Sequence, residues 1–259
     1  MGLLVGTSGF DYRDWRGPFY PTKLPQRRWL ETYADAFATV ESNNAFYRLP
    51  ERPVFQAWAE RTPDDFVMAV KMSRFLSHVR RLRDPEEPVR RFLDRAAGLD
   101  RKLGPVLIQL PPQFRSDPGR LDRTLRQFPS GIRVAVEFRH ESWFTADVRR
   151  LLERRGAALC LADRRGPVTP LWQTAGWTYL RFHEGRAAPR PCYGRAALST
   201  WVDRLQAWGP GADVWAYFNN DPRGCAPRDA ARFAALAARA GLRPTRTPTV
   251  RSIQPRREA

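Results

Sequence analysis

Charged and polar side chains in this chain recur at a spacing that could place them in one site. Three pairs stand two residues apart: Glu41 with Asn43, Glu137 with Arg139, and Arg181 with His183. Residues two apart on an extended strand point to the same side, so each pair would face one direction. Carboxylates and imidazoles exchange protons near neutral pH, and guanidinium groups bind oxyanions. The pattern therefore predicts acid/base chemistry on an anionic ligand.

Each candidate can be given a role from its chemistry. The expected acid/base residues are Glu137 or Glu41 as the general base, His183 as a general acid or base, and the nearby Asp163. The cations Lys71, Arg139 and Arg181 would bind the anion. The amides of Asn43, Gln109 and Asn219 would orient the ligand, and the aromatic loop from Trp15 to Tyr20 would form a wall or lid.

The same residues also allow a purely structural interpretation. Burying many charges has no stability rationale unless they pair or meet a ligand. Glu137 held by Arg139 or Arg181 could belong to an ion-pair network without a ligand. His78 and His140 fall in expected loops, where a histidine is most simply a surface residue.

Short apolar segments alternate with helical patterns along most of the chain. The expected strands span residues 3–7, 39–43, 66–71, 106–110, 133–138, 158–162, 178–182 and 214–218. Their nearly continuous apolar character is typical of parallel strands covered on both faces. Eight strand–helix units in about 250 residues predict an α/β fold, a single (β/α)8 TIM-like barrel, with reactive groups at the carboxyl ends of the strands.

Two features qualify this fold prediction. Residues 164–176 lack a clean helical pattern, so we expect an irregular sixth crossover. An open doubly wound sheet is the alternative, but the segment Gly6-Thr7-Ser8-Gly9 is too short for a dinucleotide-binding fingerprint.

We expect no cofactor. The barrel should occupy residues 1–242, followed by a basic, flexible tail at residues 243–259.

The charge balance favours a polyanionic partner. Among 259 residues, 44 are basic and 27 acidic, a net charge of +17, and only three of the basic residues are lysines. Arginines pair with phosphates, so a nucleic-acid phosphate is one candidate partner besides a small anionic ligand. A biased genome would explain the preference for arginine over lysine but not the shortage of acids.

Other sequence features bear on location and redox state. No apolar run is long enough to span a membrane, and no signal peptide is readable, so we expect a cytoplasmic protein with no membrane partner. The oligomeric state is not indicated. Cys160, Cys192 and Cys225 have no CxxC spacing, which predicts buried free thiols rather than disulfides.

Several longer strings resemble the YecE-like family, a group described as a domain of unknown function. They are Val5-Gly6-Thr7-Ser8-Gly9-Phe10 with Pro18-Phe19-Tyr20-Pro21, Glu41-Ser42-Asn43-Asn44-Ala45-Phe46-Tyr47, Gln109-Leu110-Pro111-Pro112, Glu137-Phe138-Arg139-His140, Arg181-Phe182-His183 and Tyr217-Phe218-Asn219-Asn220-Asp221. The resemblance spans nearly the whole chain in order. It implies a TIM-like barrel without an established reaction, related in architecture to endonuclease IV and the sugar isomerases.

The endonuclease IV comparison can be tested on residue types. That chemistry uses three zinc ions held by many histidines and carboxylates. Here the predicted strand ends supply one histidine and about three carboxylates, with Lys71, Arg139 and Arg181 among them. We therefore expect no metal cluster, although one divalent ion on Glu137, Asp163 and His183 stays open.

Three functional hypotheses follow from the residues and the resemblance. The first is a metal-independent enzyme of hydrolase or lyase type that binds a phosphate- or carboxylate-bearing ligand. The second is a nucleic-acid-binding protein with a DNA repair role like that of endonuclease IV, favoured by the charge and by aromatic side chains that could stack on a base. The third is a scaffold without catalysis, expected if the polar groups pair only with one another.

Overall fold

The strands of the chain form one eight-stranded sheet in a computed structural model that describes residues 2–209 and 211–253. The strand order is β1-β8-β7-β6-β5-β4-β3-β2. The strands are β1 (Leu3–Thr7), β2 (Thr39–Ser42), β3 (Val67–Lys71), β4 (Leu103–Gln109), β5 (Val134–Glu137), β6 (Ala158–Asp163), β7 (Trp177–Phe182) and β8 (Asp213–Phe218). A parallel bridge between Ser8 and Glu41 joins the two ends of this order. The predicted TIM-like (β/α)8 barrel is confirmed.

Helices alternate with these strands. They are α1 (Trp29–Ala36), α2 (Asn44–Tyr47), α3 (Arg52–Glu60), α4 (Glu86–Ala96), α5 (Pro118–Leu125), α6 (Ala146–Arg155), α7 (Arg195–Ala207) and α8 (Cys225–Arg239). Residues 164–176 contain no helix, which confirms the irregular sixth crossover. The sequence did not predict the one-turn α2 or a π-helical segment at Phe75–Val79.

Local chemistry explains where several helices begin and end. The Asp117 carboxylate accepts a hydrogen bond from the Arg120 backbone N–H, and Pro118 opens α5. The Thr145 hydroxyl accepts one from the Val148 N–H at the start of α6. Gly156 ends α6 with φ 61°, a left-handed conformation that favours glycine.

The strands are buried along most of their length, as their apolar sequences require. Every residue of β2, β5 and β7 is buried. At Gly6 in β1, an added Cβ would lie 2.2 Å from the Thr39 carbonyl oxygen, so only glycine allows this approach of the backbones.

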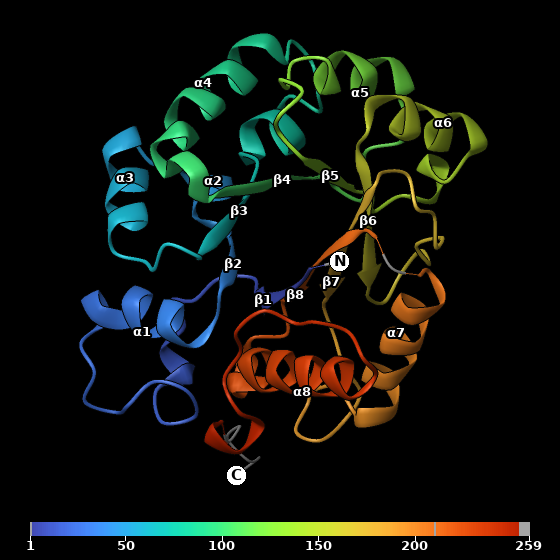
Figure 1. Cartoon of the computed structure of the whole chain (residues 1–259). Helices are drawn as coiled ribbons and strands as arrows, with labels where there is room; N and C mark the ends of the chain where they lie inside the picture. The colour runs from blue at the N-terminus through green and yellow to red at the C-terminus, as the bar shows by residue number, and fades with distance from the viewer. Residues whose placement is uncertain (1, 210, 254–259) are drawn as a thin grey trace. The chain divides into compact units, whose positions relative to one another are not determined.

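The chain divides into two compact units, which are described separately. The first unit contains Met1–Glu41, Arg61–Phe66 and Leu180–Ala259, and the second contains Ser42–Glu60 and Val67–Tyr179. In the first unit, α8 packs along β1 and β8 and next to α7 (Figure 1). In the second unit, α3 to α6 lie outside β3, β4 and β5 (Figure 1).

The end of the first unit includes part of the segment expected to be a flexible tail. The Leu3 N–H donates to the Arg243 carbonyl at 3.2 Å, and the Arg246 guanidinium pairs with Asp65 at 2.6 Å. Ile253 is buried. Residues 243–253 are thus packed against this unit, and residues 254–259 lie outside the described part of the chain.

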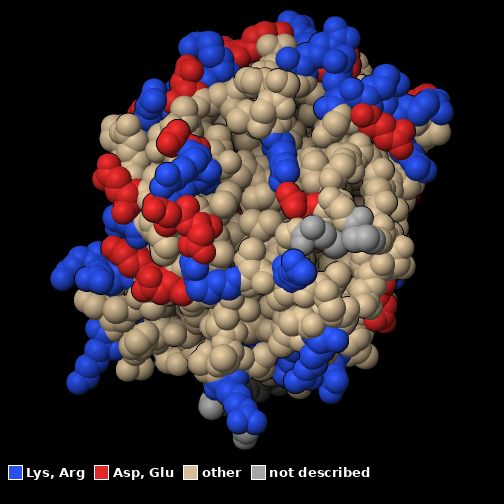
Figure 2. Space-filling view, in the orientation of Figure 1, with Lys and Arg blue, Asp and Glu red and all other residues tan. Residues whose placement is uncertain are grey.

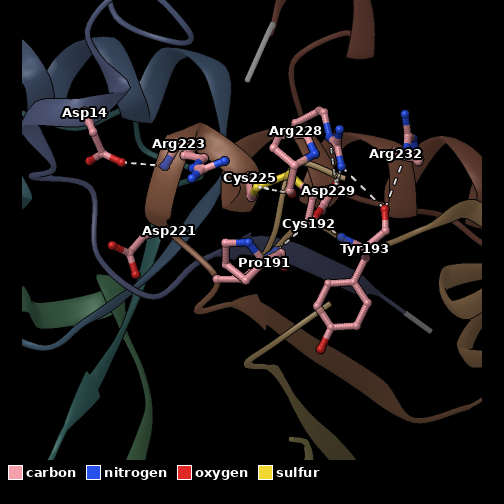
Figure 3. The surroundings of a disulfide bond; sticks show 12 residues. Asp14, Pro191, Cys192, Tyr193, Asp221, Arg223, Cys225, Arg228, Asp229 and Arg232 are labelled. Atoms are coloured by element: carbon pink, nitrogen blue, oxygen red, sulfur yellow. Dashed lines mark hydrogen bonds and ion pairs between the residues drawn. A yellow bond between two sulfur atoms is a disulfide. The ribbon is translucent and has the colours of Figure 1, made fainter. Parts of the chain in front are cut away.

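The prediction of free thiols was wrong for two of the three cysteines. Cys192 and Cys225 form a disulfide, and Cys160 is a buried free thiol. The bond joins the loop after β7 to the first residue of α8 (Figure 3). The two cysteines are 33 positions apart in the sequence, with α7 and β8 between them, so only tertiary structure brings them together.

The surface is rich in charge of both signs over part of the second unit. Lys and Arg side chains interleave with Asp and Glu over α4, α5 and α6 (Figure 2). Ion pairs with exposed arginines, such as Arg126–Asp122 and Arg149–Glu153, account for part of this pattern. No helix in residues 2–209 and 211–253 is long and apolar enough to cross a membrane.

Candidate functional site

A group of polar side chains gathers at the carboxyl ends of β4 and β5 in the second unit. Gln109 and Glu137 are register partners at the ends of these parallel strands. The Arg139 Nε donates to Glu137 Oε1 at 2.8 Å, and its Nη2 donates to Gln109 Oε1 at 3.0 Å. Glu137 is fully buried, whereas 27% of the Arg139 side chain is exposed. One face of the guanidinium group is therefore anchored while part of it faces solvent.

Lys71 extends this group from the end of β3. Its Nζ lies 3.9 Å from the centre of the Phe46 ring in α2, a cation–π contact. His78 packs edge-on against the same ring, with centroids 5.0 Å apart, and its Nδ1 lies 2.9 Å from the Ser77 hydroxyl. The Phe46 ring thus supports both a cation and an imidazole.

Arg164, the first residue after β6, adds a further cation. Its Nη1 donates to the Arg165 carbonyl at 3.0 Å. Its Nε and Nη2 are buried and have no hydrogen-bond acceptor among the described residues. Burial lowers the pKa of Arg164, and the charge of Arg139 lowers it further, while Glu137 opposes this shift. We call Lys71, Gln109, Glu137, Arg139, Arg164 and His78 the cation cluster.

The pKa of His78 reflects the charges of the cation cluster around it. Burial lowers its pKa to about 4, and the positive charges of Lys71, Arg139 and Arg74 add to this effect, whereas Glu137 acts in the opposite direction. At neutral pH this imidazole is therefore neutral. The nearby positive charges thus outweigh the negative charge of Glu137 at this imidazole.

Two further predicted residues belong to the second unit. Asn43 precedes α2, and its Oδ1 is buried without a hydrogen-bond partner in the described structure. Asp163 ends β6 and is half-buried next to Arg164 in the sequence. Asn43 directly follows β2 and Asp163 is the last residue of β6, so both lie at the carboxyl ends of strands, as the barrel architecture predicts.

The first unit holds a second polar group, built around Arg181. The Arg181 Nη2 donates to Glu41 Oε1 at 2.8 Å, and both side chains are at most 1% exposed. The same nitrogen lies 3.5 Å from the Ser8 hydroxyl and 3.4 Å from Asn219 Oδ1. Asn219 Nδ2 in turn lies 3.2 Å from His183 Nδ1. We call Ser8, Glu41, Arg181, His183 and Asn219 the buried ion-pair group.

Trp15 and Tyr20 lie in the interior of the first unit. Neither ring is exposed. The Trp15 indole N–H donates to the Asp221 carbonyl at 3.1 Å, and the Tyr20 hydroxyl donates to the Phe10 carbonyl at 2.6 Å. Tyr20 also stacks on Trp29 at 4.8 Å. Both pack as core residues, so a ligand could reach them only after residues 10–25 move.

A buried polar network surrounds the disulfide in the first unit (Figure 3). The Asp229 carboxylate accepts hydrogen bonds from the Tyr193 N–H at 2.6 Å and from Asn220 Nδ2 at 2.8 Å, and pairs with Arg228 at 2.6 Å. Burial still raises the Asp229 pKa despite these partners. The network and the disulfide together hold the loop after β7 against α8.

The arrangement of potential metal ligands also bears on the chemistry of the site. No group of three or more histidine, cysteine, aspartate or glutamate side chains is placed to hold a metal ion within the described residues. In the cation cluster, Arg139 pairs with the Glu137 carboxylate, and the positive charges of Lys71 and Arg139 both act on His78. Such surroundings suit an anion better than a cation.

A family model for "Protein of unknown function DUF72" matches residues 4–253. The chain belongs to the DUF72 family. This confirms the resemblance to the YecE-like group, because UPF0759 protein YecE of Escherichia coli strain K12 is 34% identical over 143 residues. That alignment covers 52% of this chain and 52% of YecE, so the chain spans about half the length of the curated relatives it matches.

Solved DUF72 structures have the same fold. A Thermotoga maritima family protein is 27% identical, with a TM-score of 0.81 over 92% of this chain and 100% of its own. An Enterococcus faecalis family protein, 20% identical, has a TM-score of 0.76 over 91% of this chain and 95% of its own. The second likeness shows the fold alone.

Sequence reasoning placed most of these residues but missed two members of the cation cluster. His78 was read as a surface residue because no helix or strand was expected around it, and the π-helical segment that carries it has no simple periodicity. Arg164 lies in the irregular crossover, one residue beyond Asp163. Its position directly after a strand was the available signal.

Proposed function

We propose that this protein binds a small phosphate- or carboxylate-bearing ligand at the cation cluster of the second unit. Lys71, Arg139 and Arg164 would bind the oxyanion, and Gln109 and Asn43 would orient the ligand. Guanidinium groups offer paired N–H donors that match the oxygens of a phosphate or carboxylate.

The observation that carries this proposal is the lack of hydrogen-bond acceptors for part of the Arg164 guanidinium group in the described structure. Two of its guanidinium nitrogens are buried and have no acceptor among the described residues. Leaving charged donors buried without hydrogen bonds costs several kcal/mol, on the order of the desolvation penalty for such groups. A bound oxyanion would supply the missing acceptors and offset the repulsion from Arg139.

The same cluster supports acid/base chemistry without a metal, of hydrolase or lyase type. Glu137 is an ionisable carboxylate fixed by Arg139, and His78 is a neutral imidazole whose pKa would rise when an anion binds beside it. Glu137 would act as the general base. His78 would donate or accept a proton in place of His183, which belongs to the buried ion-pair group of the first unit.

The test is calorimetric titration of inorganic phosphate into the wild type and Arg164→Ala. We expect the substitution to weaken binding about tenfold or more, because a charge-assisted hydrogen bond contributes on the order of 1.5–3 kcal/mol. Arg126→Ala is the matched control, since Arg126 forms an exposed pair with Asp122 in the same unit. Equal phosphate affinities in all three proteins would contradict the proposal.

Nucleic-acid phosphate is the second candidate partner, favoured by the net charge of +17. Retention on duplex DNA across a salt series tests it. A steep loss of binding with salt supports nucleic-acid contact, whereas elution at low salt removes the argument from charge.

Cytoplasmic location stays part of the proposal. The Cys192–Cys225 disulfide would be unusual in that compartment, because disulfides persist mainly in oxidising compartments. Alkylation of thiols in freshly lysed cells, before and after reduction, would show whether the bond is present where the protein resides.

A further inference from the structure

We infer that the anionic ligand is a nucleotide whose phosphate binds the cation cluster and whose base lies in the groove beside α2. This inference rests on the proposed function and names its substrate class. A free nucleotide and the terminal nucleotide of a single strand share this chemistry, and the experiment below distinguishes them.

The groove is a separate feature of the second unit. It has a volume of about 490 Å³ and is lined by Asn44, Tyr47, Leu49, Pro50, Val54 and Trp58, with Arg48 and Glu51. The Tyr47 ring is 76% exposed, and Val54 is 42% exposed. Aromatic rings with one open face are the usual platform on which bases stack.

Phe46 connects this groove to the cation cluster. Its ring carries Lys71 Nζ at 3.9 Å and contacts the exposed Tyr47 ring edge-on at 5.0 Å between centroids. α2, which supplies both rings, lies beside β3 (Figure 1). One aromatic ring therefore separates the ammonium group from the open face of Tyr47, so a ligand could contact both at once.

The wall of the groove is already held in place. The Arg95 side chain donates to the Leu49 carbonyl at 3.0 Å and pairs with the Glu51 carboxylate at 2.7 Å. The charge of Glu51 is thus matched by Arg95 and repels an incoming anion less. A preformed wall also reduces the ordering that a ligand must bring about.

The residues that line the groove favour a nucleobase over other groups that could be attached to the anion. A sugar phosphate or a short carboxylic acid would satisfy the cations but would leave the exposed Tyr47 ring uncovered. A planar heterocycle can stack on the Tyr47 ring and hydrogen-bond to the Asn44 amide, which lines the same groove.

The experiment compares four probes by calorimetry: AMP, ribose 5-phosphate, adenosine and inorganic phosphate. We expect AMP to bind about tenfold more tightly than ribose 5-phosphate, because stacking one base contributes on the order of 1–3 kcal/mol. Tyr47→Ala should abolish that difference and leave ribose 5-phosphate binding unchanged. Tyr47→Phe, which keeps the ring, should preserve it.

A control and a second readout keep the test decisive. Val168→Ala removes another highly exposed apolar side chain of the second unit and should change nothing. Quenching of Trp58 fluorescence by AMP, identified by its loss in Trp58→Phe, should accompany binding. A 5′-phosphorylated single-stranded oligonucleotide that outcompetes AMP assigns the source to a strand end, and the reverse order assigns it to free nucleotides.

The failures of the two proposals differ. If AMP and ribose 5-phosphate bind equally and both depend on Arg164, the nucleotide inference is overturned and the anion site stands. If AMP binds with the expected advantage but independently of Arg164, the phosphate does not occupy the cation cluster and both are overturned. An absence of AMP binding at millimolar concentration also overturns the inference.

Discussion

The two polar groups of this molecule are built from similar side chains but differ in burial and in charge balance. In the buried ion-pair group, Arg181 and Glu41 are at most 1% exposed and pair directly. In the cation cluster, Arg139 is partly exposed, and Arg164 has buried donors that lack acceptors in the described structure.

This difference is the basis for proposing a binding role for the cation cluster and a structural role for the buried ion-pair group. A buried ion pair meets its own electrostatic needs and leaves little for a ligand to gain. A cluster in which cations exceed carboxylates, with access to solvent, is stabilised when an anion arrives. Residue type alone therefore does not distinguish the two groups, whereas burial and charge balance do.

The largest expected effect concerns the buried pair. Arg181→Met should destabilise the protein by about 3–5 kcal/mol, because it leaves the Glu41 carboxylate buried without its cation. Denaturant unfolding measures the change. The double variant Glu41→Gln/Arg181→Met should recover much of the loss, and a stability near that of the wild type for Arg181→Met alone would refute the structural reading of this group.

Removing the disulfide of the first unit should have the next largest effect. Replacing both Cys192 and Cys225 by serine should lower the free energy of unfolding by about 2–4 kcal/mol, since a cross-link restricts the unfolded chain. Thermal unfolding of the variant and of the reduced wild type should agree. Cys160→Ser provides the control for a thiol that forms no disulfide. Unchanged stability in the double variant would indicate that the bond does not form in solution.

Asp221 in the first unit should lower the free energy of unfolding in a pH-dependent way. Its pKa is raised from 3.8 to about 6, chiefly by burial and in smaller part by the charge of Asp14. Between these values the folded chain binds more protons than the unfolded chain, so this carboxyl group lowers stability as the pH rises through that window. Asp221→Asn should therefore stabilise the protein by on the order of 1 kcal/mol at pH 7. Unfolding curves at pH 4 and pH 7 check this, and equal effects at both would contradict it.

The smallest expected effect is a change in phosphate affinity when the one carboxylate of the cation cluster, Glu137, is replaced. Glu137→Gln keeps the shape of the side chain and removes the negative charge, so phosphate affinity should rise about threefold to tenfold. The His78 pKa should also fall, because Glu137 holds it up. Calorimetry and NMR titration measure these changes. Weaker phosphate binding in this variant would mean that Glu137 positions the arginine more than it repels the anion.

Local sequence patterns were sufficient for the fold and for most strand ends. All eight predicted strands are present, and Glu137, Asp163 and Lys71 each end a strand as expected. The site was only partly predictable, because residues such as Arg139 and Arg181 looked equivalent in sequence. Neither periodicity nor spacing states how deeply a side chain is buried or which carboxylate it will meet.

The sequence by itself determined the alternation of apolar strands with amphipathic helices, because burial on both faces of a parallel strand and on one face of a helix leaves a local pattern. Tertiary structure alone decided that Arg181 meets Glu41, 140 residues away, that Cys192 meets Cys225, and that Arg164 keeps buried donors without an acceptor in the described structure. The physical reason is that pairing and desolvation depend on distances between segments far apart in the chain, which only closure of the barrel sets.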